Sequence, residues 1–516
     1  MFHKTHLTNL KRIIHSAIFA GLLSVCGNTQ TPDDPGDYPE PAVKYLQNIF
    51  SKDQYKYSFR TDYPGGFETW QQETRPVLRR LIGLQKISAQ VGNHQPTVEL
   101  NEMEDLGEYT RQRGSIETEP DVQIPFWILK PKSAKPCPIA ILPHGHDTRG
   151  YDTHAGVYHD EAHRERTLEG DRDVAVQAVK HGFVAIAPAT RGLADGGLPD
   201  IRERHEDRGC RAQLIHCLLA GRTAIGERVW DMERLIDWAV TLPEVNPKNI
   251  LMMGNSGGGV LTLYAAACDE RIKIAVPSCS FTTFTSPNGY IYHCDCNLVP
   301  GILELGDMYD VAGLIAPRYL LAVNGRKDSL HSAADIERSA AGAKAIYTAA
   351  GCPERFEHRW GEEGHRFYKD LTWPFIHEAI TSLSRSDALE SPLPQDKTAR
   401  LVADPVESIR AVLPKGWIIL RVHKETCPWF LQAGKGTAVH LAREGKEYVK
   451  MDLDVAVFIM PADYGGRIDT DAAPFQFPSP RLAAHISDAK IYIWGGGPPI
   501  WPTMTEDILG ALIVKE

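Results

Sequence analysis

Short apolar runs alternate with amphipathic helical stretches through the middle of the chain. From residue 121 onward the apolar runs are IPFWILKPK, PIAILPHGHD, FVAIAPATRG, NILMMGNSGGG, IKIAVPSC, RYLLAVNGRKD and FEHRWGEEGH. Continuous apolar runs are typical of strands buried on both faces, and their alternation with helices is typical of a parallel sheet. Residues 118–385 are therefore predicted to form an α/β domain with a mostly parallel central sheet and helices on both faces.

The segments on either side of this domain have different patterns. Residues 41–117 show mainly helical spacing, as in PVLRRLIGLQKI, and predict a helical lead-in or cap segment. Residues 386–405 are polar and contain several prolines, which is typical of a linker. Residues 406–516 hold strand-like PKGWIILRV, DVAVFIMPA and AKIYIWGG with helices expected near Ser408 and Glu506, so they predict a small α+β domain whose role the pattern leaves unassigned.

The N-terminus has the pattern of an export signal. Basic residues precede a mostly apolar stretch over 13–25, which is shorter than the roughly 20 residues of a membrane span. It resembles a bacterial export signal over residues 1–26, and a frayed N-terminal helix is the alternative. The protein is then periplasmic, an outer-surface lipoprotein or secreted.

The end of this signal resembles a lipobox. The residues Leu-Ser-Val-Cys end at Cys26, which would be lipidated and would become the mature N-terminus, although Val25 departs from the small residue usual there. A lipidated Cys26 is the one route of membrane attachment that we expect. Residues 27–40 are polar and rich in proline, and they predict a tether.

Charge and cysteine content exclude some classes of function. The net charge is −10 without a basic run, whereas a nucleic-acid groove needs clustered lysine and arginine, so no nucleic-acid partner is expected. Nine cysteines remain after Cys26, an odd number that does not suit a disulfide scaffold in a large domain. Cys294 and Cys296 in HCDCN match no common zinc spacing. We therefore expect buried or oxidised thiols in that loop and no metal.

A lone serine stands at a strand-to-helix turn that is crowded with glycine. The sequence GNSGG over 254–258 matches the Gly-x-Ser-x-Gly nucleophile elbow, with the apolar NILMM before it and the helical VLTLYAAACD after it. A serine hydroxyl is a weak nucleophile that needs a neighbouring base, and the base needs an orienting acid. Ser256 is the predicted nucleophile, and the amide of Gly257 is the predicted first oxyanion donor.

The acid and the base follow the serine in the order that this motif requires. Asp328 comes after the strand RYLLAVNG, and His365 comes after the strand that contains FEHRWG. Both lie at carboxyl ends of predicted strands, where the sites of open α/β sheets gather. Asp335, inside a helical pattern, is a weaker rival for the acid, and His331 and His358 are weaker rivals for the base.

The loop after an earlier strand should supply a second oxyanion donor. In LPHGHD we expect the backbone amide of His146, with that of Gly145 as the alternative. The side chains of His144 and His146 shape this turn in our interpretation, and a metal pair is the lesser alternative. Arg191, after the strand FVAIAPAT, is a possible substrate contact or, more often for such an arginine, a residue that holds its own loop.

Residues 118–385 resemble an α/β-hydrolase of the dienelactone-hydrolase and acetyl-xylan-esterase-like group. The segments that carry this resemblance are HGHD, GRTAIGERVWDMERLIDW, MGNSGGG, HCDCN, DVAGLIAPRYLLAVNGRKD and EEGH. Dienelactone hydrolases proper use a cysteine nucleophile, so Ser256 favours the esterase side. The resemblance implies cleavage of carboxylic esters, often acetyl groups on plant polysaccharide, without a metal or organic cofactor. A small ester or an acylated carbohydrate is the expected substrate.

Two other functions remain open at this stage. A serine peptidase of the prolyl-oligopeptidase type shares the order of the triad but usually carries a long β-rich lead domain. A surface protein that binds carbohydrate without catalysis on a hydrolase fold is the second alternative. The complete set of Ser256, Asp328 and His365 argues against it, because a site that has lost its function tends to lose such residues.

Overall fold

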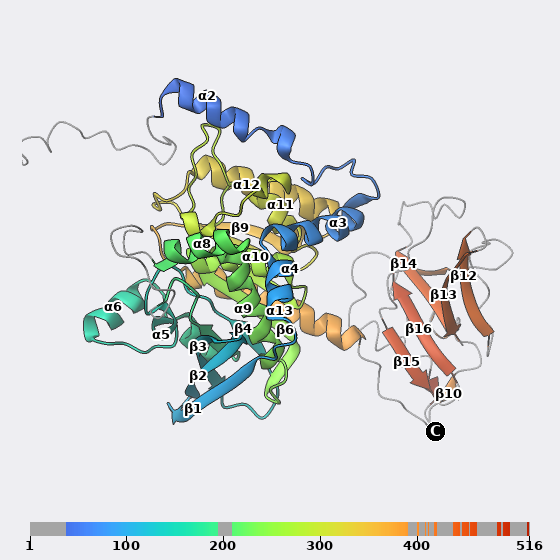
Figure 1. Cartoon of the computed structure of the whole chain (residues 1–516). Coiled ribbons are helices and arrows are strands. Elements are labelled where there is room, and N and C mark those ends of the chain that lie inside the picture. Colours follow the sequence, from blue (N-terminus) through green and yellow to red (C-terminus); the bar gives the residue numbers. More distant parts are fainter. Residues whose placement is uncertain are drawn as a thin grey trace, which may run out of the picture. The chain divides into compact units, whose positions relative to one another are not determined.

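The computed structural model describes residues 38–194, residues 209–390 and several short segments between residues 400 and 514 (Figure 1). The chain divides into two compact units, Met1–Ala379 and Ile380–Glu516. The predicted export signal, Cys26 and the tether up to residue 37 lie outside the described residues and stay predictions. Within the described residues, no helix is both long enough and apolar enough to cross a membrane.

A nine-stranded sheet forms the centre of the first unit, in the order β1-β2-β3-β5-β4-β6-β7-β8-β9. Strands β5, β4, β6, β7, β8 and β9 run parallel to one another, and β1, β2 and β3 form an antiparallel edge in which β3 pairs antiparallel with β5. The bounds are β1 (Thr97–Asp105), β2 (Tyr109–Glu119), β3 (Val122–Pro131), β4 (Cys137–Ile141), β5 (Val184–Pro188), β6 (Val245–Asn255), β7 (Ile272–Ser278), β8 (Tyr319–Gly325) and β9 (Phe356–Gly361). This confirms the predicted mostly parallel sheet.

Helices cover this sheet as the strand pattern predicted. α10 packs on β6 and β7 and contacts α9 and α3, whereas α7 packs on β3 and β5. The bounds are α2 (Glu40–Ile49), α3 (Gly66–Leu81), α4 (Leu84–Val91), α5 (Gly150–His154), α6 (Glu161–Glu169), α7 (Val174–Lys180), α8 (Gly209–Ala220), α9 (Ala224–Ala239), α10 (Gly257–Cys268), α11 (Met308–Gly313), α12 (Ala333–Ala349) and α13 (Lys369–Glu390). Residues of β5 and the inner part of β6 are buried, since helices exclude water from both of their faces.

The prediction of a mainly helical lead-in over 41–117 is correct only for its first part. α2, α3 and α4 are helices, but residues 97–105 and 109–119 are strands β1 and β2 of the main sheet. The side chains of β1 are almost all exposed, so neither face shows the apolar period of a strand. β1 pairs antiparallel with β2, and β2 pairs antiparallel with β3, whose central residues are buried. One hydrophobic core contains Trp70 and Leu78 of α3 together with Ile128 of β3, so this segment belongs to the first unit.

The second unit contains the strands that the apolar runs predicted. PKGWIILRV contains β11 (Trp417–Leu420), DVAVFIMPA contains β14 (Val455–Pro461), and AKIYIWGG contains β16 (Ala489–Gly495). These strands and β15 (Leu482–Ile486) form one sheet, and the remaining strands are β10 (Arg400–Leu401), β12 (Thr437–Arg443), β13 (Lys446–Leu453) and β17 (Ile513–Val514).

The predicted linker over 386–405 begins too early. α13 continues through this boundary to Glu390, because SRSDALE contains no proline and favours a helix. The helix expected near Glu506, and nearly all of the one expected near Ser408, lie outside the described residues.

Candidate active site

Ser256 stands at the sharp turn between β6 and α10. Its backbone has φ 58° and ψ −125°, a region that residues other than glycine rarely adopt and that costs about 1–3 kcal/mol. The amide of Ser256 donates to the carbonyl oxygen of Ser278 at the end of β7, at 2.9 Å. The chain therefore holds this serine in a strained conformation at the carboxyl edge of the sheet.

The glycines around Ser256 allow backbone segments to approach more closely than any side chain would permit. A Cβ atom on Gly258 would lie 2.2 Å from the carbonyl oxygen of Pro143, and one on Gly254 would lie 2.6 Å from the carbonyl oxygen of Gly258. A Cβ atom on Gly145 would lie 2.9 Å from Cβ of Ser256. The loop after β4 is thus packed directly against the serine.

The structure brings the predicted acid and base together. Nδ1 of His365 lies 2.7 Å from Oδ2 of Asp328, and the amide of Leu330 donates to Oδ1 of Asp328 at 3.0 Å. The Asp328 side chain is 4% exposed, whereas that of His365 is 28% exposed. Burial raises the pKa of Asp328, but the hydrogen bond and the charge of His365 outweigh burial and hold the pKa below its usual value. This carboxylate therefore stays ionised and faces the imidazole.

The weaker candidates occupy other surroundings. Asp335 lies inside α12 and is paired with Arg338. Nε2 of His358 lies 3.2 Å from Oδ1 of Asn324, and burial lowers the pKa of His358 to about 4. Burial likewise lowers the pKa of His331 to about 3. These contacts favour Asp328 as the orienting acid and His365 as the base.

Cys279 is a neighbour of this pair that the sequence did not point to. It follows β7, has φ 47°, and its sulfur lies within 4.8 Å of ligand atoms of Asp328 and His365. Burial, reinforced by the charge of Asp328, raises the pKa of Cys279 to about 12. The thiol is therefore protonated at neutral pH and is a poor nucleophile. A positive φ after a strand leaves no recognisable signal in the sequence.

The two predicted oxyanion amides lie on segments that meet at the elbow. Gly257 is the first residue of α10, and its amide lies 3.2 Å from the position that a Cβ of Gly145 would take. A Cβ on Gly257 would in turn lie 3.2 Å from Nδ1 of His146. The role of the amides of Gly257 and His146 stays a prediction.

The side chains of the two loop histidines differ in their contacts. Nδ1 of His144 lies 2.7 Å from the carbonyl oxygen of Gly145, and Nε2 of His144 accepts from the amide of Thr190. Burial lowers the pKa of His144 to about 3, so this ring is neutral and shapes the turn. His146 points elsewhere: with Cys210, Cys294 and Cys296 it forms a cluster that could hold a metal ion.

Arg191 is held in a buried network of charges. Its side chain is 10% exposed, and its guanidinium donates to Asp231 at 2.9 Å and to Glu119 at 2.7 Å. Glu227 lies 3.2 Å away, and Arg222 binds Glu119 and Glu227 from the other side. This geometry favours the interpretation in which Arg191 fixes its own loop over the one in which it contacts substrate.

We expect that replacing Arg191 by methionine lowers the free energy of unfolding by about 3–5 kcal/mol, because Asp231 and Glu119 would remain buried without their cation. Urea unfolding of both proteins measures this change. The control is Arg164→Met, which removes an exposed pair with Glu161 and should cost less than about 1 kcal/mol. An Arg191→Met protein with unchanged stability and a raised KM would support the substrate-contact reading instead.

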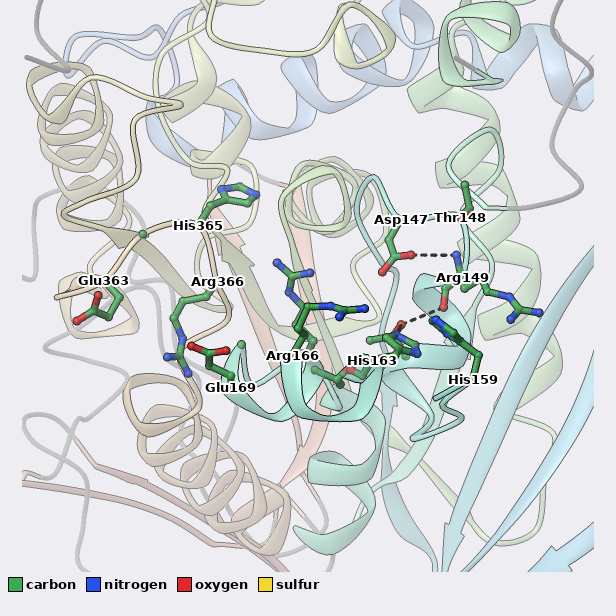
Figure 2. A pocket seen from close by; sticks show the side chains of 15 residues that line it. Asp147, Thr148, Arg149, His159, His163, Arg166, Glu169, Glu363, His365 and Arg366 are labelled. Atoms are coloured by element: carbon green, nitrogen blue, oxygen red, sulfur yellow. Dashed lines mark hydrogen bonds between the residues drawn. The ribbon is translucent and has the colours of Figure 1, made fainter. Parts of the chain in front are cut away.

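A polar cavity of about 790 Å³ opens beside His365. Figure 2 shows His365 and Glu363 on one side of it and Asp147, Arg149 and His159 on the other. Arginine, histidine, threonine and carboxylate side chains dominate its lining. Such a lining offers many hydrogen-bond donors and acceptors, which suits a ligand rich in hydroxyl groups.

Comparison with known proteins agrees with this architecture. The acetyl xylan esterase family model matches residues 91–285, a range that includes His146 and Ser256 but ends before Asp328 and His365. YtaP of Bacillus subtilis, named provisionally as a hydrolase, is 24% identical over 270 residues, which cover 51% of this chain and 83% of YtaP. A provisionally named carboxymethylenebutenolidase of Synechocystis is 32% identical over 96 residues, which cover 19% of this chain and 37% of that protein.

A solved structure shows the same fold. The crystal structure of a provisionally named acetyl xylan esterase from Bacteroides fragilis superposes with a TM-score of 0.53 and 16% identity, covering 67% of this chain and 99% of that one. The resemblance noted in the sequence has a dienelactone-hydrolase part and an acetyl-xylan-esterase part. The carboxymethylenebutenolidase corresponds to the first part and the acetyl xylan esterase model to the second. These matches agree with the α/β-hydrolase fold of the first unit, and they show that residues 91–285 resemble the acetyl xylan esterase family.

Proposed function

We propose that the protein is an exported serine esterase that hydrolyses carboxylic esters of the acetyl type on carbohydrate through an acyl-serine intermediate. The observation that carries this proposal is the 2.7 Å contact between Asp328 and His365 at the carboxyl edge of the sheet. The same edge holds Ser256 in the strained turn of a nucleophile elbow.

The reaction follows from the chemistry of these three side chains. Nε2 of His365 takes the proton of the Ser256 hydroxyl as Oγ attacks the ester carbonyl carbon. The amides of Gly257 and His146 donate to the oxyanion that forms. Nε2 then gives its proton to the leaving alcohol, which yields acyl-Ser256. Nε2 of His365 then takes a proton from water as the water attacks the acyl carbon, and it returns this proton to Oγ of Ser256 as the acid leaves, while Asp328 accepts from Nδ1–H throughout.

The proposed substrate class rests on the cavity and on the family. The lining beside His365 is polar and contains Arg149, Arg166 and His163, which suits a hydroxylated alcohol better than a long aliphatic chain. The family model that covers Ser256 is that of acetyl xylan esterases. An acetyl group on a sugar hydroxyl is therefore the ester that we propose.

The peptidase alternative is disfavoured by the N-terminal part of the first unit. There, α2, α3 and α4 are followed by β1 and β2, which extend the main sheet and do not form a separate β-rich domain. The non-catalytic alternative is disfavoured by the Asp328–His365 contact. Export is proposed from residues 1–26, and the mass of the mature N-terminus isolated from the native host would test it.

Covalent labelling tests the serine mechanism directly. A fluorophosphonate ester reacts with serines that a neighbouring base activates, so we expect one adduct per chain, located by peptide mass spectrometry on the peptide that contains Ser256. His365→Ala should slow the labelling by at least about 100-fold, since general-base catalysis contributes about 10²–10⁴-fold. Labelling at another residue, or equal rates in both proteins, would contradict the proposal.

A further inference from the structure

Four side chains from three distant segments converge beside the proposed active site. His146 lies in the loop after β4, Cys210 in the first turn of α8, and Cys294 and Cys296 in the loop between β7 and α11. Their ligand atoms all lie within 4.8 Å of one another. The sulfur of Cys296 lies 3.5 Å from Nε2 of His146 and 3.6 Å from the sulfur of Cys294.

We propose that His146, Cys210, Cys294 and Cys296 bind one Zn²⁺ ion in a closed tetrahedral site. Zinc binds cysteine sulfur at about 2.3 Å and histidine nitrogen at about 2.0–2.1 Å, and three cysteines with one histidine is a common structural set. A tetrahedron with these bond lengths has edges of about 3.5–3.8 Å. The two separations at Cys296 match such edges, whereas a disulfide would need about 2.05 Å between sulfurs.

The charge of a buried arginine supports the same assignment. Arg228 is 0% exposed, and within the described chain its guanidinium contacts the backbone oxygen of Arg191, the amide oxygens of Gln213 and Asn297, and the sulfur of Cys296 at 3.5 Å. Of these groups only the sulfur can carry negative charge. Three thiolates and one Zn²⁺ carry a net charge of −1, which the Arg228 cation neutralises.

The remaining charged groups at the cluster cancel one another. Asp295 lies between the two cysteines, and its Oδ2 is ion-paired with Arg211 at 2.5 Å. Its Oδ1 accepts from the amide of Cys296 at 2.9 Å, so this carboxylate holds the turn that presents the two sulfurs. His146 is exposed and Cys294 is partly exposed, which gives an ion a path to the site.

Binding would replace three thiol protons by one ion. The thiols of Cys210, Cys294 and Cys296 release their protons to water, neutral His146 binds through Nε2, and no oxidant or reductant takes part. Protein atoms fill all four coordination positions of the ion, so the ion has a structural role. The site was hidden in the sequence because Cys294-Asp-Cys296 supplies only half of it and the other half comes from α8 and the loop after β4.

This site would also fix the loop that faces the nucleophile. Nδ1 of His146, on the other side of the ring from the sulfurs, lies 3.2 Å from the place of a Cβ on Gly257. An ion on Nε2 would therefore hold in place the residue whose backbone amide is the second proposed oxyanion donor. This second step rests on the proposed function, whereas zinc binding does not, and His146 acts here as a positioning residue.

Zinc content is the test. The full chain is purified in reducing buffer from zinc-supplemented cells, and zinc is measured by mass spectrometry. We expect about one ion per chain, and less than a tenth of that in Cys296→Ser and in Cys294→Ser. Cys352→Ser, a buried cysteine outside the cluster, should keep the ion. Cobalt added to the zinc-depleted chain should give the visible absorption of a tetrahedral thiolate complex. Cys294 is only partly buried, so its variant serves if Cys296→Ser does not fold.

The outcomes separate the two proposals. The site is overturned if the wild-type chain holds no zinc, gives no cobalt absorption after reduction and has three reactive thiols. It is also overturned if the cluster contains a disulfide and binds no metal after that disulfide is reduced. One zinc ion in a chain without esterase activity supports the site and contradicts the proposed function. An esterase whose kcat falls with the zinc that a chelator removes supports the positioning of His146, and an unchanged kcat overturns it.

Discussion

Replacing Ser256 by alanine is expected to lower kcat for p-nitrophenyl acetate by about 10⁴-fold or more, the scale seen when one member of a catalytic triad is removed. The alanine variant lacks the hydroxyl that His365 would activate, so no acyl-enzyme can form. Any residual rate then comes from the oxyanion donors and from binding. The measurement is steady-state release of p-nitrophenol by the two full-length proteins at equal concentration.

The control for this experiment is Ser88→Ala, which changes an exposed serine on α4 and should leave kcat unchanged. A far-ultraviolet circular dichroism spectrum and a urea midpoint close to those of the parent show that the Ser256→Ala protein is folded. Equal rates in Ser256→Ala and the parent would mean that another residue is the nucleophile. Absence of turnover in the parent would favour the serine peptidase or the non-catalytic carbohydrate-binding protein over the esterase.

The central sheet was predictable because its buried strands have continuous apolar sequences. FVAIAPA and ILMM are apolar at every position, as is typical of strands covered on both faces, and they contain β5 and part of β6. β1 was not predictable, since TVELNEMED has apolar residues only at Val98, Leu100 and Met103 and is almost entirely exposed. Its conformation comes from backbone pairing with β2, which is a tertiary effect that local periodicity does not record.

The candidate triad was predictable for a related reason. In an open α/β sheet the functional side chains follow the carboxyl ends of strands, so the elbow motif pointed to Ser256, and chain order with strand ends pointed to Asp328 and His365. The partners of Arg191 were not predictable, because Glu119 and Asp231 come from β2 and α9. The cluster at Cys296 was hidden for the same reason, as His146 lies 150 residues away in the chain.

Replacing Asp328 by asparagine is the second large effect that we expect. Asp328 accepts from Nδ1–H of His365 at 2.7 Å, which leaves Nε2 free to take the serine proton. An asparagine can present its NH₂ group to Nδ1, and this stabilises the tautomer that carries the proton on Nε2. That tautomer cannot act as the base. It also loses the negative charge that stabilises the imidazolium, so kcat should fall by about 10⁴-fold.

The matched control is Asp335→Asn, which removes the carboxylate of the weaker candidate in α12 and should leave kcat within about threefold, since that carboxylate pairs with Arg338.

Asp328 also makes a contribution to the free energy of unfolding that depends on pH. Its pKa is lowered in the folded chain, so this contribution is full above the unfolded pKa of about 3.9 and is lost as the pH falls. Asp328→Asn should remove that part of the acid dependence while the fold persists at neutral pH. If Asp335→Asn abolished turnover and Asp328→Asn did not, Asp335 would be the orienting acid, and the 2.7 Å contact at His365 would be a structural pair.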